Sequence, residues 1–124
     1  MDIIISNATG VPIYDQIVRQ IKALILQGEP KEGEALPSMR LLAKELRISV
    51  ITTKRAYEEL ERSGFLVTVP GKGCFVAPQN PELQREETLR RVEDHLTRAV
   101  EAGRMGGISL AEMAETLNIL YGDD

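Results

Sequence analysis

The sequence predicts a mainly α-helical protein with one small β-hairpin, an α+β fold built from 124 residues. Two observations lead to this class. Apolar residues recur at helical spacing in several segments, and a Gly-rich turn over residues 70–73 separates two short runs of β-type residues. Between Leu36 and Val76 these features follow one another as helix, tight turn, helix and hairpin. That order is typical of a winged helix-turn-helix domain, and a short two-helix tail follows it.

The first predicted helix runs from Val11 to Gln27. Pro12 suits its first turn, where a missing amide costs nothing, and Gly28 suits the residue that ends it. A broad apolar stripe comprises Ile13, Ile17, Val18, Ile21, Leu24 and Ile25. The stripe predicts burial against two further helices. Residues 3–5 are long enough only for an edge strand or a packing arm, and residues 29–34 are expected to form a polar connector.

A second helix is expected to begin at Pro37 and Ser38. Its apolar residues repeat at helical spacing, and they are Leu41, Leu42, Ala43 and Leu46. A short connection then leads to Ser49, a candidate N-cap whose hydroxyl can accept a hydrogen bond from a free amide of the next helix. This third helix is expected to end at about Ser63.

The third helix is predicted to have two different faces. The face expected to be buried holds Thr53, Ala56, Tyr57 and Leu60. The face expected to meet solvent holds Val50, Ile51, Lys54, Arg55 and Glu58. Gly64 suits a left-handed residue after the helix. Strands over Phe65–Val69 and Cys74–Val76 then form the wing.

Cationic side chains are concentrated where a winged helix meets DNA. Lys54 and Arg55 can reach phosphates or base edges if the start of the third helix enters the major groove. Arg40, which follows the Ser38 cap, can donate a bidentate pair of hydrogen bonds to guanine. Lys72 lies at the wing tip. Each cation alone could be an ordinary solvated side chain, but together on this scaffold they favour DNA binding.

Four short motifs of this segment occur together in one protein family. They are Pro12-Ile13-Tyr14-Asp15-Gln16-Ile17, Leu36-Pro37-Ser38-Met39-Arg40, Lys54-Arg55-Ala56-Tyr57-Glu58-Glu59-Leu60 and Gly71-Lys72-Gly73-Cys74-Phe75-Val76. With these motifs, residues from about 10 to 77 resemble the GntR family of bacterial transcription regulators. The short helical tail makes the chain most similar to the YtrA-like subgroup, in which a compact tail replaces a large effector-binding domain.

The resemblance implies a way of binding DNA and the residues that contact it. Members of the family bind a double-stranded operator as dimers through the winged helix. By position, Arg40 corresponds to a base-contacting arginine and Gly71 to the wing residue that approaches the minor groove. Ser49, Thr52 and Lys54 correspond to contacts around the recognition helix. The complete expected DNA-binding set is Ser38, Arg40, Ser49, Val50, Thr52, Lys54, Arg55, Gly71 and Lys72.

Val50 and Ile51 depart from the family pattern, because many relatives have polar or cationic residues here. The departure favours contact with thymine methyl groups over hydrogen-bonded readout at this turn. We predict a sequence-specific transcriptional regulator, a repressor that binds an inverted-repeat operator as a homodimer. Repression is favoured because a small dimer can block polymerase without an activating surface. The alternative is a winged-helix adaptor that binds only protein, and such an adaptor does not need the cationic residues.

A proline-bracketed linker over residues 77–81 separates the predicted DNA-binding domain, residues 1–78, from a helical dimerisation tail, residues 82–124. The first tail helix is expected over Glu82–Ala102, with Gly103, Gly106 and Gly107 breaking it. Ser109 and Glu112 form a capping box for a final helix.

Apolar residues of the tail step by three and four along each helix, as in a narrow coiled-coil seam. We expect a dimer interface that contains Leu89, Val92, Leu96, Leu117 and Leu120. The alternative is a tail that folds back on its own head. Dimerisation is favoured because so small a helix pair has little core of its own.

Composition narrows the remaining possibilities. No apolar run approaches a membrane span and the start of the chain lacks the features of a signal peptide, so we expect a cytoplasmic protein without a membrane partner. The net charge is −4, but residues 1–79 carry ten Lys or Arg against nine Asp or Glu, whereas residues 80–124 carry five against ten. The acidity therefore belongs to the tail and does not exclude DNA binding by the head.

Catalytic and metal chemistry is not expected. Gly71-Lys72-Gly73 lacks the spacing of a P-loop, and His95 has no nucleophile partner in the sequence. Cys74 has no neighbours at metal-ligand spacing and is expected to be a small apolar side chain of the second wing strand. We therefore predict no enzyme, no metal and no cofactor. The sequence identifies neither the operator, the regulated genes nor an effector.

Overall fold

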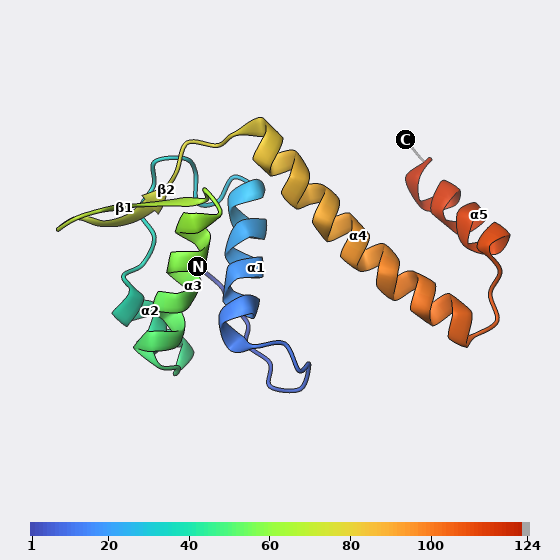
Figure 1. The fold of residues 1–124 in the computed structure, drawn as a ribbon, viewed down its shortest axis with the longest axis horizontal. Helices are drawn as coiled ribbons and strands as arrows, with labels where there is room; N and C mark the ends of the chain where they lie inside the picture. Colours follow the sequence, from blue (N-terminus) through green and yellow to red (C-terminus); the bar gives the residue numbers. More distant parts are fainter. Residues whose placement is uncertain (123–124) are drawn as a thin grey trace. The chain divides into compact units, whose positions relative to one another are not determined.

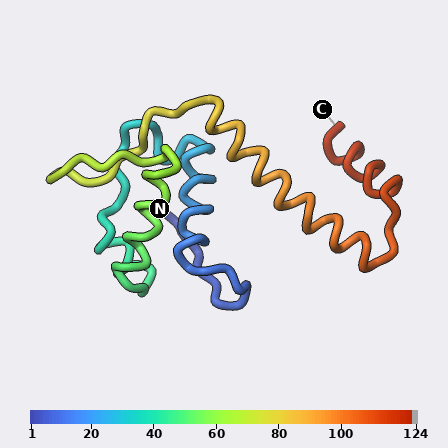
Figure 2. The backbone as a smooth tube through the Cα atoms, in the orientation of Figure 1, coloured from blue at the N-terminus to red at the C-terminus, as the bar shows by residue number. Residues whose placement is uncertain are grey.

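A computed structural model describes residues 1–122 of the chain, and its path is drawn in Figures 1 and 2. The elements follow the predicted order, and they are α1 (Ile13–Leu26), α2 (Met39–Leu46), α3 (Val50–Arg62), β1 (Leu66–Val69), β2 (Gly73–Val76), α4 (Pro81–Met105) and α5 (Leu110–Tyr121). The predicted class, mainly helical with a small β-wing, is confirmed. The chain forms two compact units, one over Met1–Gln84 and one that begins at Arg85.

The first unit is built on the three helices α1, α2 and α3. Their apolar faces share one core, in which the largest fully buried side chains include Tyr57, Ile17, Ile21, Leu42 and Leu60. The predicted buried face of α3 is confirmed, whereas Leu41 of α2 is 47% exposed. Burying side chains of this size stabilises a fold by roughly 1.5–3 kcal/mol each. The core therefore fixes the packing of α2 against α3.

The buried hydroxyl of Tyr57 connects α3 to the start of α2. It donates a hydrogen bond to the carbonyl oxygen of Pro37 at 2.8 Å. Burial is the main cause that raises the pKa of Tyr57, so the phenol stays protonated and keeps its donor. The bond holds the chain where it enters α2.

The chain before α1 is a packing arm and not a strand. Ile3 is buried in the core. The amide side chain of Gln20 accepts from the backbone N–H of Ile4 at 2.9 Å and donates to its carbonyl at 2.7 Å. Gln16 pairs in the same way with the N–H and carbonyl of Ser6. Two glutamines of α1 thus bind the arm as a neighbouring strand would.

The wing is an antiparallel hairpin in which Leu66 pairs with Val76 and Val69 with Gly73. Residues 33–36, of which the first two belong to the expected polar connector over residues 29–34, also pair with β2. The N–H of Leu36 donates to the carbonyl of Cys74, and that of Val76 to the carbonyl of Glu34, both at 2.9 Å. The wing is therefore tied to the segment that leads into α2.

In the second unit, α4 and α5 meet at a glycine. Gly103 was expected to break the first tail helix, and this prediction was wrong, because α4 continues to Met105. Gly103 is buried, and a Cβ there would lie 2.7 Å from the sulfur of Met113 on α5. The glycine thus lets Met113 pack closely against α4, and the helix ends instead before Gly106 and Gly107.

The start of α5 agrees with the predicted capping box. The Ser109 hydroxyl accepts from the N–H of Glu112 at 3.1 Å and lies 3.3 Å from its carboxylate. No residue of α5 from Leu110 to Tyr121 is buried, although the helix is rich in leucine.

Candidate nucleic-acid interface

The start of α2 is organised by Ser38. Its hydroxyl accepts a hydrogen bond from the N–H of Leu41 at 3.1 Å, so the serine is an N-cap as predicted. Arg40 follows one residue into the helix and is exposed. Because the cap and the Tyr57–Pro37 hydrogen bond both fix this end of α2, the position from which Arg40 extends is well defined.

A left-handed residue makes the turn between α2 and α3. Arg47 caps the end of α2 with φ of 57°, a conformation that side chains other than glycine seldom adopt. The expected short connection is thus as tight as a helix-turn-helix needs, although nothing in the residue type of Arg47 predicted its backbone conformation.

The start of α3 is held by Ser49 and Thr52. The Ser49 hydroxyl accepts from the N–H of Thr52 at 3.1 Å, and the two hydroxyls lie 3.0 Å apart. Two apolar side chains follow the cap, and Ile51 is 80% exposed against 44% for Val50. This end of α3 therefore presents an apolar contact surface next to two hydroxyls that still have hydrogen-bonding capacity.

The cationic side chains of the expected DNA-binding set differ in the groups that they contact. Lys54 lies 3.9 Å from a carboxylate oxygen of Glu58, a weak and exposed ion pair. The guanidinium of Arg55 lies over the ring of Tyr14 at 3.8 Å. Within residues 1–122, Arg40, Arg55 and Lys72 form no ion pair. Their charges are therefore not neutralised by a carboxylate among these residues.

The wing tip extends away from the three helices (Figure 1). Gly71 has φ of 77° and Gly73 has φ of 113°, so both adopt backbone conformations that favour glycine. Lys72 lies exposed between them. A substitution of Gly71 meets open space but a strained backbone, so glycine is required here by the turn.

Acidic residues of α3 are concentrated toward its C-terminal end. Arg62 binds the Glu59 carboxylate with two nitrogens, at 2.6 and 3.0 Å. This hydrogen bonding lowers the pKa of Glu59 and raises that of Arg62. Glu61 accepts a hydrogen bond from the hydroxyl of Thr68 on β1. The N-terminal half of α3, in contrast, carries Lys54 and Arg55 and no acidic residue.

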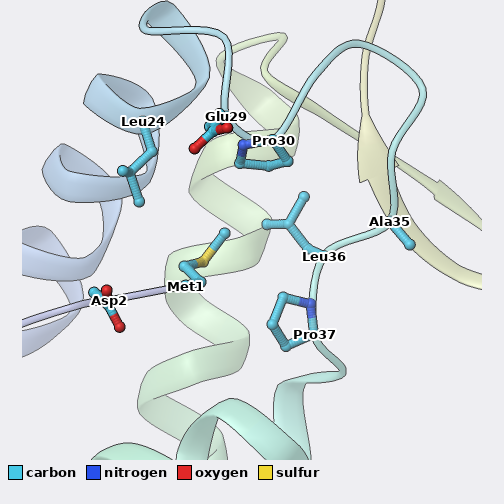
Figure 3. A pocket seen from close by; sticks show the side chains of 8 residues that line it. All are labelled: Met1, Asp2, Leu24, Glu29, Pro30, Ala35, Leu36 and Pro37. Atoms are coloured by element: carbon cyan, nitrogen blue, oxygen red, sulfur yellow. The ribbon is translucent and has the colours of Figure 1, made fainter.

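A hollow of about 520 Å³ lies on the first unit, lined in part by residues 35–37 just before α2. Figure 3 shows the side chains of Met1, Leu24 and Leu36 pointing toward this common space, with the carboxylate of Glu29 at its edge. Its described lining includes the carboxylates of Asp2 and Glu29 but no histidine, cysteine or serine.

Metal-binding clusters and membrane-spanning helices are both absent from the described part of the chain. Residues 1–122 contain no group of His, Cys, Asp and Glu that could hold a metal ion. None of the helices there is both long and apolar enough to cross a membrane. Cys74 is buried in β2, as expected, and His95 is exposed on α4.

Comparison with known proteins identifies related chains. The family model for bacterial regulatory proteins of the gntR family matches residues 13–76. The HTH-type transcriptional repressor YtrA of Bacillus subtilis (strain 168) is 31% identical over 119 residues, which cover 96% of this chain and 92% of that protein.

Solved structures agree with the sequence matches. A transcriptional antiterminator from Listeria monocytogenes EGD-e superposes with a TM-score of 0.73 at 30% identity, over 97% of this chain and 90% of that one. AraR(DBD), solved in complex with an operator, superposes with a TM-score of 0.53 at 27% identity, over 62% of this chain and 94% of that one.

Proposed function

The chain belongs to the GntR family of bacterial regulatory proteins and is a DNA-binding transcriptional regulator, and we propose that it is a repressor that binds an inverted-repeat operator as a homodimer. Its similarity to YtrA over nearly the whole chain places it with the YtrA-like members of the family. Family membership does not favour the alternative of an adaptor that binds only protein.

One observation carries the proposed mode of binding: two capped helix starts and a glycine-supported wing tip are all exposed on the first unit. Ser38 and Ser49 fix the starts of α2 and α3, and their exposed cations have few carboxylate partners. Phosphate contacts of such cations give most of the non-specific affinity for DNA, and base contacts give the sequence preference.

The proposed roles follow from what each side chain can offer. Arg40 reads a guanine through paired N–H donors, and Lys54 and Arg55 bind phosphates. Val50 and Ile51 contact thymine methyl groups, and Ile51 is the more exposed of the two. The other residues of the expected DNA-binding set contact the DNA backbone or a groove from the helix starts and the wing tip. They are Ser38, Ser49, Thr52, Gly71 and Lys72.

We further propose that the head, residues 1–78, binds DNA and that the tail, residues 82–124, holds two copies together. Leucines and valines that should be buried in a stable protein are exposed along both tail helices. Their exposed fractions are 52% for Leu89, 47% for Val92, 44% for Leu96, 48% for Leu117 and 76% for Leu120. An apolar surface of this kind is typical of a protein interface, and a second copy supplies a matching seam by symmetry.

We also propose that the protein represses transcription and that it is located in the cytoplasm. YtrA and NagR of Bacillus subtilis are named as transcriptional repressors, and a small dimer seated on a promoter blocks polymerase without further surfaces. The operator of a bacterial regulator lies on DNA in the cytoplasm, so we place the protein there.

Selection from a random double-stranded DNA library tests the proposed function. The full-length protein is expected to enrich one sequence family with two-fold symmetry. The control is a variant with Arg40→Ala and Lys54→Ala, which should enrich this family much less strongly than the wild-type protein does. Enrichment of no sequence by the wild-type protein would contradict the proposal, and so would enrichment of an asymmetric single site.

A further inference from the structure

Tyr14 and Arg55 form a stacked pair between two helices. Tyr14 lies in the first turn of α1, and Arg55 lies in the N-terminal half of α3. The central guanidinium carbon is 3.8 Å from the centroid of the tyrosine ring, a distance typical of cation–π stacking. Tyr14 packs against the core and is half-buried, whereas Arg55 is exposed. The ring is thus held by packing, and the exposed partner is the arginine.

The carboxylates near this pair are engaged by other cations. Arg62 holds Glu59 at 2.6 Å, and Lys54 is the ion-pair partner of Glu58. Both glutamates line a hollow of about 230 Å³ together with Tyr14, Arg55 and Arg62. Glu58 and Glu59 follow Arg55 by three and four residues, the spacing at which helical side chains can pair, yet within residues 1–122 Arg55 has no ion pair. The aromatic ring is therefore the group that orients Arg55.

Stacking leaves the hydrogen-bonding capacity of Arg55 intact. All five N–H donors of a guanidinium lie in its plane, so a ring against one face sets the orientation of that plane without using a donor. Two parallel N–H groups then remain for the oxygens of a phosphate. A lysine at the same position has neither the plane nor the paired donors.

The location of the pair indicates which part of DNA it meets. The stack on Tyr14 places the guanidinium of Arg55 against α1, on a flank of α3, whereas Val50 and Ile51 are the first two residues of the helix. When a recognition helix lies in the major groove, the sugar–phosphate backbone runs along its flanks and the base edges lie under its tip. A side chain on the flank therefore meets phosphate.

We propose that Tyr14 is a positioning residue for DNA binding, whose ring orients the guanidinium of Arg55 toward an operator phosphate. The inference rests on the proposed docking of α3 in the major groove. Tyr14 acts through Arg55 and does not itself read sequence, so its effect extends to operator and scrambled DNA alike.

A double-mutant cycle measures this coupling. Tyr14→Leu removes the ring, Tyr14→Phe keeps the ring and removes the hydroxyl, and each is combined with Arg55 or with Arg55→Ala. Affinity for the selected operator and for scrambled DNA is measured at several salt concentrations, and thermal unfolding monitors the fold. An exposed cation–π pair contributes roughly 0.5–1 kcal/mol, which corresponds to an affinity loss of about two- to fivefold per recognition helix.

The proposal expects this loss for Tyr14→Leu when Arg55 is present, near-wild-type affinity for Tyr14→Phe, and no further loss for Tyr14→Leu beside Arg55→Ala. An equal loss in both backgrounds would overturn it, because Tyr14 would then act through the fold or by its own contact. A loss for Tyr14→Phe as large as that for Tyr14→Leu would do the same, because the hydroxyl would then be the active group.

A second variant covers the case in which Tyr14→Leu fails to fold. Arg55→Lys leaves α1 untouched and keeps the charge, and it should weaken binding to both DNAs because the stacked, paired donors are lost. Unchanged affinity of Arg55→Lys would overturn the proposal. If the wild-type protein binds no operator, the proposed function fails as well, whereas normal wild-type binding without Tyr14–Arg55 coupling overturns this inference alone.

Discussion

Replacing Tyr57 by phenylalanine should have opposite effects on stability at neutral and at alkaline pH. At pH 7 the variant loses the hydrogen bond from the Tyr57 hydroxyl to the carbonyl of Pro37. A buried hydrogen bond of this kind contributes about 1 kcal/mol to the free energy of unfolding. The ring itself stays, so no large cavity forms, and the expected cost of Tyr57→Phe at pH 7 is about 1 kcal/mol.

At alkaline pH the stability difference between wild type and Tyr57→Phe changes sign, because the pKa of Tyr57 is raised in the folded protein, chiefly by burial. In the unfolded chain the phenol has its ordinary pKa of about 10. Above that pH the unfolded state loses its proton while the folded state keeps it, so wild-type stability falls by about 1.4 kcal/mol per pH unit. Phenylalanine has no such proton. The two stabilities should therefore become equal about one pH unit above 10.

Urea unfolding followed by circular dichroism, from pH 7 to pH 11 at one fixed protein concentration, measures this difference. Other groups that titrate at high pH affect both proteins and cancel in the comparison. A difference between wild type and Tyr57→Phe that stays constant from pH 9 to pH 11 would refute the reasoning, as would a variant that is more stable than wild type at pH 7.

Further substitutions test the DNA-binding and dimer proposals. Arg40→Ala should weaken operator binding by roughly 1–3 kcal/mol and relax preference at one position per half-site; an equal loss on scrambled DNA would exclude base reading. Lys54→Ala should weaken binding to all sequences and lower the salt slope by about one per half-site, which titrations at several salt concentrations measure. Gly71→Val, compared at matched folding stability, should weaken operator binding because valine disfavours the positive φ of the wing turn, and unchanged affinity would count against docking of the wing. Leu96→Glu should convert a dimer to monomer in sedimentation at micromolar concentration, whereas Thr97→Glu on the adjacent face should not; a wild-type monomer would contradict the dimer.

Features that depend on residues close in sequence could be predicted. Ser38 and Ser49 cap helices because the amides they accept from lie three residues away. The buried and exposed faces of α3 follow from a period of 3.6 residues. Gly64, with φ of 83°, ends α3 in the left-handed conformation that its position predicted.

Features that depend on distant residues could not be predicted from the pattern. The Tyr57–Pro37 hydrogen bond joins residues 20 apart in sequence, and the Tyr14–Arg55 stack joins two helices. Gly103 is another case in which a residue distant in sequence decides the local structure. Its low intrinsic helix propensity predicted a break, but the residue lies inside α4, where the side chain of Met113 on α5 occupies the space that a Cβ would take.

The residues of the DNA-binding set lie on exposed parts of α2, α3 and the wing, but their roles follow from the resemblance and from chemistry. Ser49 and Thr52 illustrate the difference. Their hydroxyls bind each other and cap α3, so the same atoms serve the fold and could serve DNA. Only measurements on DNA separate these two roles.

Hydroxyl-radical footprinting of the wild-type protein on its selected operator tests the central claim most directly. Two recognition helices related by a two-fold axis should enter successive major grooves on one side of the duplex. The account therefore predicts two symmetric sets of protected sugars, with centres of the half-sites about one helical turn, roughly 10 bp, apart. A single asymmetric protected region, or protection spread evenly around the duplex, would contradict it.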